Sequence, residues 1–192
     1  MLFSSTTFLF LFLPMLLLLY YSPLFKQRVS RNVLLLIGSL GFYAWGEPVF
    51  VLLMIISIFI TWLIGKRLEN NHQKSLLVIA TVYHVAVLFV FKYLTFICSQ
   101  VGLVFGRKSS IDIELPIGIS FFTFQLMSYV FDVYYGKVKA QKNLLYLGLY
   151  VSFFPQLIAG PIVRYSDIEE QIINRVESSD DVASGFRRFV FG

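Results

Sequence analysis

The chain has few charged residues for its length, since only 14% of its 192 residues are Asp, Glu, Lys or Arg. Soluble domains carry about 25% charged residues, and a soluble globule of this size could not cover its surface with so few. The composition therefore excludes a soluble enzyme, a disordered tail and a nucleic-acid-binding domain. The net charge of +5 does not reverse this conclusion, because the cations lie in clusters between apolar runs, as in membrane loops.

Cysteine, histidine and phosphate-binding motifs are also scarce. The single cysteine, Cys98, excludes an intramolecular disulfide and a cysteine-rich metal site, and we expect it to be a small buried side chain. No glycine-rich phosphate loop and no informative set of Ser, His and Asp is present. His72 lies in a polar loop and is expected to be solvated. His84 lies inside an apolar run, where it either bonds a neighbour or has a function, but no second metal ligand is within helical reach.

Apolar residues make up 57% of the chain and are concentrated in long runs. Because a bilayer core needs about 20 apolar residues per helix, they predict an all-α fold, a polytopic bundle of transmembrane helices. The six runs are residues 4–21, 32–43, 49–64, 75–91, 115–136 and 143–162. No cation precedes the first run, and Tyr20 and Tyr21 close it as interface aromatics, so we expect a retained helix rather than a signal peptide.

Local signals predict where these helices end. The turn at 45–48 closes the second run and opens the third. Gly65, followed by two cations, predicts the end of the third helix, and Pro116 is expected at an early position of the fifth. Lys92 interrupts the fourth run, where we expect one long helix that continues through 94–105 and projects beyond the bilayer.

Cations in short loops predict the orientation of the chain. Three loops are rich in cations: Lys26, Arg28 and Arg31; Lys66, Arg67 and Lys74; Lys137, Lys139 and Lys142. They lie on one side if each run spans the membrane once. The intervening loops, 45–48 and 106–114, have no net positive charge, so we expect the amino terminus outside and the cation-rich loops in the cytoplasm.

Residues 164–192 differ in character from the membrane-spanning residues 1–163. Four apolar residues at helical spacing predict a short amphipathic helix: Ile168, Ile172, Ile173 and Val176. Residues 178–181 predict a turn and cap for a further helix, which is still apolar where the sequence stops. We therefore expect the chain to be the amino-terminal part of a longer protein, truncated inside a helix.

The segment 115–129 contains polar residues that ordinary membrane helices lack. Gly118 lets another backbone approach, and Ser120, Thr123 and Gln125 can hold membrane helices together by hydrogen bonds. Asp132 follows seven residues after Gln125. We expect one of two roles for Asp132. It lies at the membrane interface or in a structural ion pair, or it lies near a substrate path.

The segment 153–165 breaks a helix at membrane depth. Four of its residues interrupt the helix or add a polar group: Pro155, Gln156, Gly160 and Pro161. Such backbone is tolerated where it is buried in protein or lines a cavity. Arg164 can either bind an anionic group or extend to the membrane surface.

These two segments, in this order and at this separation, resemble the membrane-bound O-acyltransferase family, in particular its bacterial alginate O-acetylation and D-alanyl transfer branch. The matching residues are 115–125 with Tyr129 and 132–134, and then 153–165. Three further segments also resemble the family in the types of residue they contain: 42–48, 91–93 and 185–189. The resemblance covers the chain from about residue 33 to residue 192.

The resemblance implies a multi-helix membrane enzyme of the bacterial inner membrane, with a tunnel through its middle. It would transfer an acyl group, acetyl above all, from acetyl-CoA or an acyl carrier to hydroxyls of a surface polysaccharide such as alginate. Its expected partners are the lipid bilayer, the polysaccharide and periplasmic acetylation proteins, with no nucleic acid. The family's catalytic histidine lies on a later helix, so we expect no catalytic residue here and no activity of this chain alone. The tunnel candidates are Gln125, Asp132, Pro155, Gln156, Gly160, Pro161 and Arg164.

Two alternatives remain open at this point. Broken helices together with Asp132 and His84 also suit the permeation path of a transporter or channel. A non-catalytic membrane scaffold subunit fits the missing histidine.

Overall fold

The computed structural model describes residues 5–94, 96–97, 115–157 and 163–191. These residues form helices and no strand, which confirms the all-α fold class. Two of the helices are π-helical segments, η1 and η2. In chain order the helices are η1 (Phe8–Phe12), α1 (Leu13–Tyr21), α2 (Arg28–Gly46), α3 (Phe50–Asn71), α4 (Lys74–Leu88), η2 (Phe89–Tyr93), α6 (Ile119–Tyr134), α7 (Leu144–Ser152), α8 (Phe154–Leu157), α9 (Tyr165–Asn174) and α10 (Ser179–Phe191).

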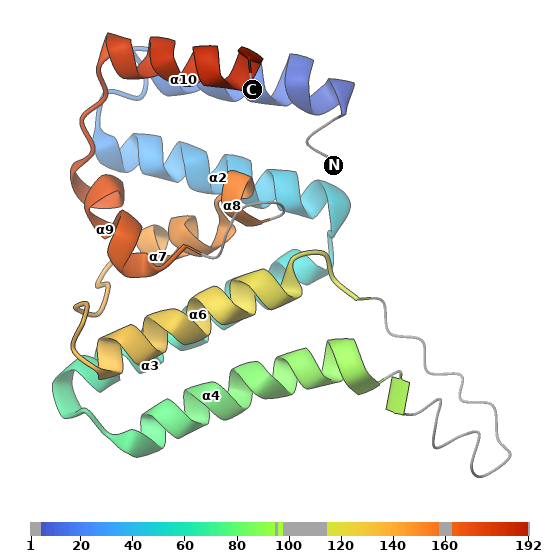
Figure 1. Ribbon diagram of the computed structural model, residues 1–192, viewed down its shortest axis with the longest axis vertical. Helices are drawn as coiled ribbons and strands as arrows, with labels where there is room; N and C mark the ends of the chain where they lie inside the picture. Colours follow the sequence, from blue (N-terminus) through green and yellow to red (C-terminus); the bar gives the residue numbers. More distant parts are fainter. Residues whose placement is uncertain (1–4, 95, 98–114, 158–162, 192) are drawn as a thin grey trace, which may run out of the picture.

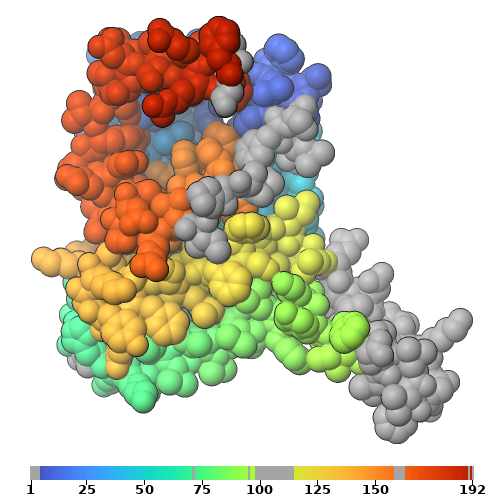
Figure 2. Space-filling model, in the orientation of Figure 1, coloured from blue at the N-terminus to red at the C-terminus, as the bar shows by residue number. Residues whose placement is uncertain are grey.

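The helices form two layers with their axes side by side (Figure 1). The first layer follows chain order, with α2 packed between α1 and α3, and α3 packed against α4. In the second layer, α6 contacts both α3 and α4, while α7 contacts α2 and α3. The space-filling view places α10 and α4 at opposite edges of the molecule (Figure 2). The main core therefore lies between the layers, around fully buried side chains such as Met54, Phe122 and Leu147.

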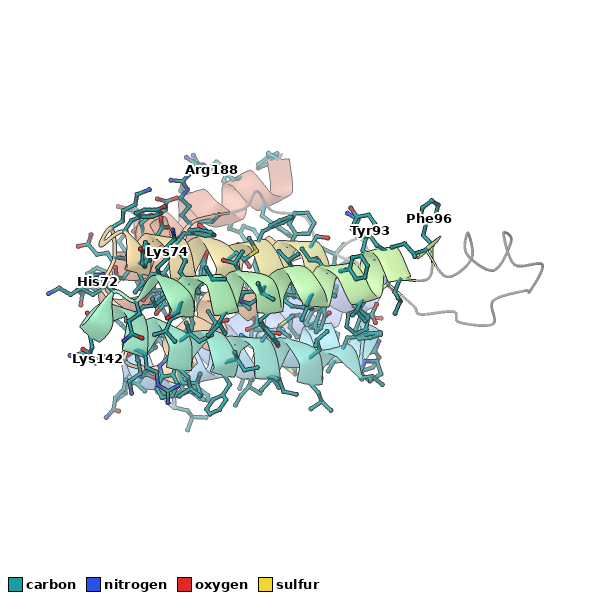
Figure 3. The ribbon with its side chains drawn as sticks, turned by 90° about the horizontal axis from the view of Figure 1, so that it is seen from below. His72, Lys74, Tyr93, Phe96, Lys142 and Arg188 are labelled. Carbon is teal, nitrogen blue, oxygen red and sulfur yellow. The ribbon has the colours of Figure 1, made fainter. Side chains whose placement is uncertain are left out.

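The three cation-rich connections lie at the same end of the bundle. The α1–α2, α3–α4 and α6–α7 connections all face left in Figure 1. In Figure 3, His72, Lys74 and Lys142 lie at one end, and Tyr93 and Phe96 lie at the other. The structure thus brings together the loops that the charge pattern places on one side of a membrane.

Within the described part of the chain, two helices are long and apolar enough to cross a bilayer: residues 50–70 of α3, and α4 with η2 over residues 74–93. The first helix, over Phe8–Tyr21, is apolar but shorter. The fourth helix continues through the exposed Lys92, as expected, and residues 98–105, including Cys98, lie outside the described residues.

Two expected helix ends are wrong. The third helix does not end at Gly65 but continues to Asn71, and it ends at His72, whose φ is +43°. Instead, Gly65 allows the Tyr129 ring of α6 to pack closely against α3, since a Cβ there would lie 3.1 Å from that ring. The fifth helix begins at Ile119, after Pro116 rather than around it, because Gly118 has a φ of +79° and cannot continue a helix.

The carboxyl-terminal segment forms the two helices that were expected. Ile172 on α9 is buried, but Val176 lies beyond the helix and is 87% exposed, so its assignment to the apolar face is wrong. At the start of α10, the Ser178 hydroxyl accepts from Asp181 N (3.1 Å) and the Asp181 carboxylate accepts from Ser178 N (3.1 Å). This reciprocal pair is a capping box, which confirms the predicted cap.

Candidate functional site

Three of the sequence segments that carry the family resemblance contact one another. The Tyr43 hydroxyl donates to the Ile117 carbonyl (3.0 Å), and Ile117 N donates to the Glu47 carboxylate (3.2 Å), so segment 42–48 fixes the entry to α6. A Cβ added to Gly118 would lie 3.1 Å from the Leu157 carbonyl oxygen at the end of α8. Glycine is therefore required here both by its positive φ and by the close approach of α8.

The chain from α7 to α9 enters the bundle and returns to the same end. The nine residues of α7 rise about 14 Å, less than half of the roughly 30 Å of a bilayer core. The short α8 follows, with Phe154 N donating to Ser39 Oγ on α2 (3.3 Å). The chain then comes back, since the Tyr150 hydroxyl on α7 donates to the Val163 carbonyl just before α9 (2.9 Å). The residues between, 158–162, lie outside the described part of the chain.

Three buried tyrosines and one glutamine hold the returning chain. Tyr165 packs edge-to-face against Tyr129 and Tyr150, with ring centroids 5.2 and 5.3 Å apart. Gln141 joins them, because its Nε2 donates to the Tyr165 hydroxyl (2.6 Å) and its backbone N donates to the Tyr129 hydroxyl (2.8 Å). Aromatic pairs with this geometry and satisfied hydroxyls give a rigid junction between α6, α7 and α9.

An apolar cavity of about 160 Å³ lies beside this junction, bounded by α2, α7, α8 and α9. Its lining residues are Leu35, Leu149, Tyr150, Phe153, Gln156, Ile168, Gln171, Ile172 and Arg175. Gln156 Oε1 and Arg175 Nη2 have no hydrogen-bond partner within the described residues. Whole ligand pockets are roughly 300 Å³ or larger. The cavity is therefore smaller than a whole ligand pocket, and among the described residues its lining contains no His, Cys or carboxylate that could act as a nucleophile or base.

Of the predicted tunnel residues that the structure describes, only Gln156 lines this cavity. Pro155, beside it on α8, is exposed, and Arg164 is an exposed residue at the start of α9. Gly160 and Pro161 lie outside the described residues. Their tunnel roles stay predictions.

Gln125 and Asp132 are both buried on α6, 2% and 5% exposed. Gln125 Oε1 and Asp132 Oδ2 have no hydrogen-bond partner in the described chain. The other Asp132 oxygen lies 3.7 Å from Lys137 Nζ, which is the structural ion pair that one of the two alternatives expects. Neither residue lines the apolar cavity.

The two histidines occupy ordinary positions. His72 is exposed in the α3–α4 connection, as expected. His84 is buried on α4, and its Nε2 lies 3.0 Å from Thr61 Oγ1 on α3, so it bonds a neighbouring helix. Within the described residues, no group of three or more His, Cys, Asp or Glu side chains could hold a metal ion.

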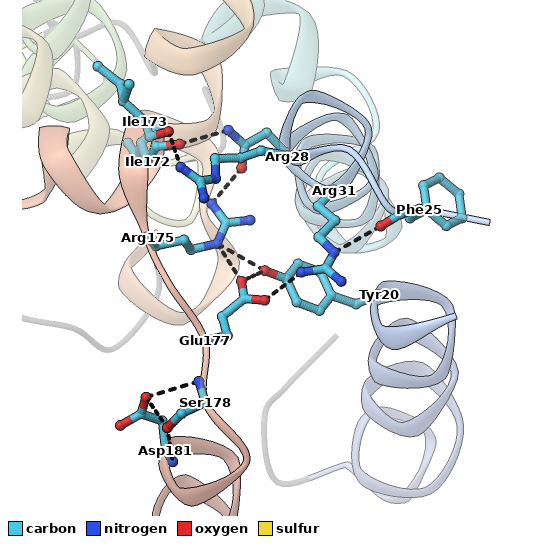
Figure 4. Close-up of polar contacts among 11 residues, drawn as sticks. Tyr20, Phe25, Arg28, Arg31, Ile172, Ile173, Arg175, Glu177, Ser178 and Asp181 are labelled. Atoms are coloured by element: carbon cyan, nitrogen blue, oxygen red, sulfur yellow. Dashed lines mark hydrogen bonds and ion pairs between the residues drawn. The ribbon is translucent and has the colours of Figure 1, made fainter. Parts of the chain in front are cut away.

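A polar cluster that the sequence did not indicate lies next to the cavity (Figure 4). Glu177, after α9, accepts from Tyr20 on α1 and pairs with Arg31 (2.6 Å) and Arg175 (2.8 Å). Asn32 on α2 accepts from Arg175 Nη1 (2.6 Å). Apart from the Arg175–Glu177 pair, these contacts join residues 143–157 positions apart, and no local pattern in the sequence indicates them.

The cluster also sets the ionisation of its carboxylate. Burial raises the pKa of Glu177, but hydrogen bonds from Tyr20 and Arg175 and the charges of Arg175 and Arg31 lower it by more. The net result is a pKa below the ordinary value, so Glu177 is ionised at neutral pH.

Comparison with known proteins relates the whole chain to part of larger enzymes. It is 41% identical to the probable alginate O-acetylase AlgI of Pseudomonas aeruginosa and 38% identical to that of Azotobacter vinelandii, over 100% of this chain. It is 29% identical, over 89% of this chain, to a peptidoglycan O-acetyltransferase of Helicobacter pylori. The chain spans 38–40% of the length of these three relatives.

No family model and no solved structure matches the chain. The alignments to the two AlgI proteins nevertheless include both motif segments, because they cover the full sequence. The chain is therefore a homologue of the alginate O-acetylases, which confirms its resemblance to the membrane-bound O-acyltransferase family.

Proposed function

We propose that this chain supplies part of a membrane O-acyltransferase that transfers an acyl group, acetyl in the first instance, to hydroxyls of a cell-surface polysaccharide. The observation that carries the proposal is the identity of 41% over the whole chain to a probable alginate O-acetylase. Alginate is the acceptor that this relative suggests, and the Helicobacter pylori relative suggests peptidoglycan as a second one. Because these relatives are O-acetyltransferases by name, the transporter and scaffold alternatives have lost their support.

The donor, in this proposal, is acetyl-CoA or an acyl carrier. The resemblance to the family implies that the histidine that activates the acceptor hydroxyl lies in the remainder of the enzyme, and the described lining of the apolar cavity contains no such base. The part described here contributes walls and positioning. Gln156 serves this role most directly, since its unpartnered amide oxygen lies at an apolar cavity.

The proposed location is the bacterial inner membrane, with several passes. It is supported by the apolar helices and by the three cation-rich connections at one end of the bundle. With that end in the cytoplasm, the opposite end faces the compartment that holds the polysaccharide and any periplasmic acetylation proteins. The donor and the acceptor then approach the enzyme from opposite sides.

The proposal is tested by acetyl transfer in membranes that contain the complete enzyme. We expect Gln156→Ala, Gln125→Ala and Arg164→Ala each to lower acetylation about tenfold at normal expression, because small displacements in an acyl-transfer site are costly. Gln73→Ala is the matched control, since Gln73 is an exposed residue of the α3–α4 connection. The chain on its own is expected to show no transfer.

Two results would contradict different parts of the proposal. Normal acetylation by all three variants would remove the positioning role of this part of the enzyme. Failure of the complete wild-type enzyme to acetylate alginate or peptidoglycan, with either class of donor, would remove the proposed function itself.

A further inference from the structure

A second cavity, of about 200 Å³, lies at the cation-rich end of the bundle. Its lining residues are Lys26, Arg28, Arg31, Arg175, Val176 and Glu177. Four of them are cations and one is an anion, so the lining carries a surplus of three positive charges. The cavity shares Arg175 with the apolar cavity but is otherwise separate from it.

The cations are held in place by contacts with other parts of the chain. Arg28 Nη1 donates to the Ile173 carbonyl (2.6 Å), one of the carbonyls left free at the end of α9. Arg31 Nε donates to the Phe25 carbonyl (2.8 Å), while its Nη1 pairs with Glu177. The side chains of Arg31 and Arg175 are only 27% and 19% exposed. They are thus preorganised, and binding an anion would cost little side-chain entropy.

One carboxylate does not satisfy this set of donors. A guanidinium has five N–H donors, and Arg175 Nη2 is buried without a hydrogen-bond partner among the described residues. Partly buried like charges this close also repel one another. A bound anion would relieve the repulsion and accept from lining donors that are open to solvent, such as the ammonium of the exposed Lys26.

The start of α2 adds a third contribution. The helix begins at Arg28, a lining residue, and Gln27 before it makes no side-chain cap. The first turn of α2 therefore supplies Arg28 and Arg31 to the lining, near the positive end of the helix dipole. Phosphate is the anion that suits a helix start flanked by arginine forks.

We propose that this basic cavity binds the phosphate group of a monoester or diester. The volume of the cavity suits a single phosphate group. The group can come from the headgroup of an anionic lipid or from a soluble phosphate compound, because the cavity lies at the end of the helices where both can reach it. This binding is independent of the acyl-transfer function.

The test uses the chain in nanodiscs, with binding followed by calorimetry. One arm adds inorganic phosphate or pyrophosphate to nanodiscs of neutral phosphatidylcholine. The other arm measures the stabilisation of the chain when phosphatidylglycerol is included. Saturable binding of soluble phosphate assigns a soluble source, and stabilisation by phosphatidylglycerol alone assigns a lipid headgroup. Either result supports the site.

Matched variants separate the cavity from general positive charge. Lys26→Gln with Arg28→Gln removes two cations of the lining, and we expect about tenfold weaker binding. Lys74→Gln with Lys142→Gln removes two exposed cations at the same end, outside the lining, and should leave the affinity unchanged. Arg28→Lys keeps the charge but loses the fork, so an intermediate loss is expected even if the double variant folds poorly.

Three outcomes would overturn the proposal. One is no binding or stabilisation in either arm. Another is an equal loss of affinity in both double variants, which would show a diffuse effect of charge. The third is competition by acetate as strong as that by phosphate, which would show a general anion site.

Discussion

Gln141 shows how one side chain can fix the position of a long segment. Its side-chain amide donates to Tyr165, its amide oxygen accepts from Asn143 N (2.8 Å), and its backbone N donates to Tyr129. The donors and acceptors are buried and satisfied. The loss of one partner therefore leaves a buried polar group without a hydrogen bond, and this costs more than the net value of the bond.

We expect Tyr165→Phe to lower the free energy of unfolding by about 1–3 kcal/mol, because Gln141 Nε2 loses its acceptor while the ring packing is kept. Denaturation of the chain in detergent measures the change. Tyr135→Phe is the control, since Tyr135 is 66% exposed, and it should change stability by less than about 0.5 kcal/mol. Equal stability of the two variants would show that the Gln141 bond has no net value.

Gly118 is the second residue with a specific structural demand. We expect Gly118→Ala to destabilise the chain by about 1–3 kcal/mol, because its φ is +79° and the new Cβ would lie 3.1 Å from the Leu157 carbonyl oxygen. Gly41→Ala on α2 is the control, since a Cβ there meets nothing within 4 Å. It should be neutral or stabilising by up to about 1 kcal/mol. Thermal unfolding of both variants measures the change in stability. An unchanged stability of Gly118→Ala would contradict the close contact of α8 with α6.

At the scale of elements, the connection between α9 and α10 depends on an ionised carboxylate. The pKa of Glu177 is lower in the folded chain than its ordinary value of 4.5. A carboxyl group whose pKa is lowered by folding contributes its full stability at pH values above its ordinary pKa. That stability is lost as the pH falls through the pKa of the folded state. The contacts of Glu177 with Arg31 and Arg175 should therefore loosen only in acid.

We expect hydrogen-exchange protection of the last turn of α9, residues 171–174, to be constant from neutral pH down to 4.5 and to fall below it. Glu177→Gln should remove this acid-dependent step, since the variant side chain does not titrate. Asp181→Asn should keep it, because Asp181 caps α10 and does not contact the arginines. An unchanged pH profile in Glu177→Gln would assign the step to another group.

The elements also show what the sequence could predict. The long apolar runs correctly predicted the main helices, because hydropathy reflects burial and lipid contact directly. The predicted helix ends at Gly65 and Pro116 were wrong. A glycine such as Gly65 can either end a helix or admit a neighbouring side chain, and only the position of Tyr129 distinguishes the two. At Pro116 the positive φ of Gly118 delays the helix start. The capping box at Ser178 was predictable because it is local.

At the scale of the whole molecule, the candidate site combines segments far apart in sequence. The unusual composition of 115–129 and 153–165 marked both as important, and the structure brings them into contact at Gly118 with Leu157 and at Tyr129 with Tyr165. The cluster of Tyr20, Arg175 and Glu177 could not be predicted. Tyr20 lies 155 and 157 positions from its partners Arg175 and Glu177, and their pairing depends on how α1 and α9 pack.

The return of the chain after α8 is the feature on which the site depends most. If α7 and α8 enter from the cation-rich end and the chain comes back to it, α9 lies on the same side of the membrane as the α3–α4 connection. The apolar and basic cavities then both lie toward the cation-rich end of the bundle. If the chain crosses instead, Tyr165 cannot meet Gln141 and neither cavity forms.

The most direct measurement is labelling of single cysteines by a membrane-impermeant maleimide, in a Cys98→Ser background. Lys74→Cys, Val49→Cys and Glu170→Cys place exposed thiols in the α3–α4 connection, in the α2–α3 turn and on α9. We predict that Glu170→Cys labels from the same side as Lys74→Cys and from the opposite side to Val49→Cys. Labelling of Glu170→Cys from the same side as Val49→Cys would contradict the returning chain and the site built on it.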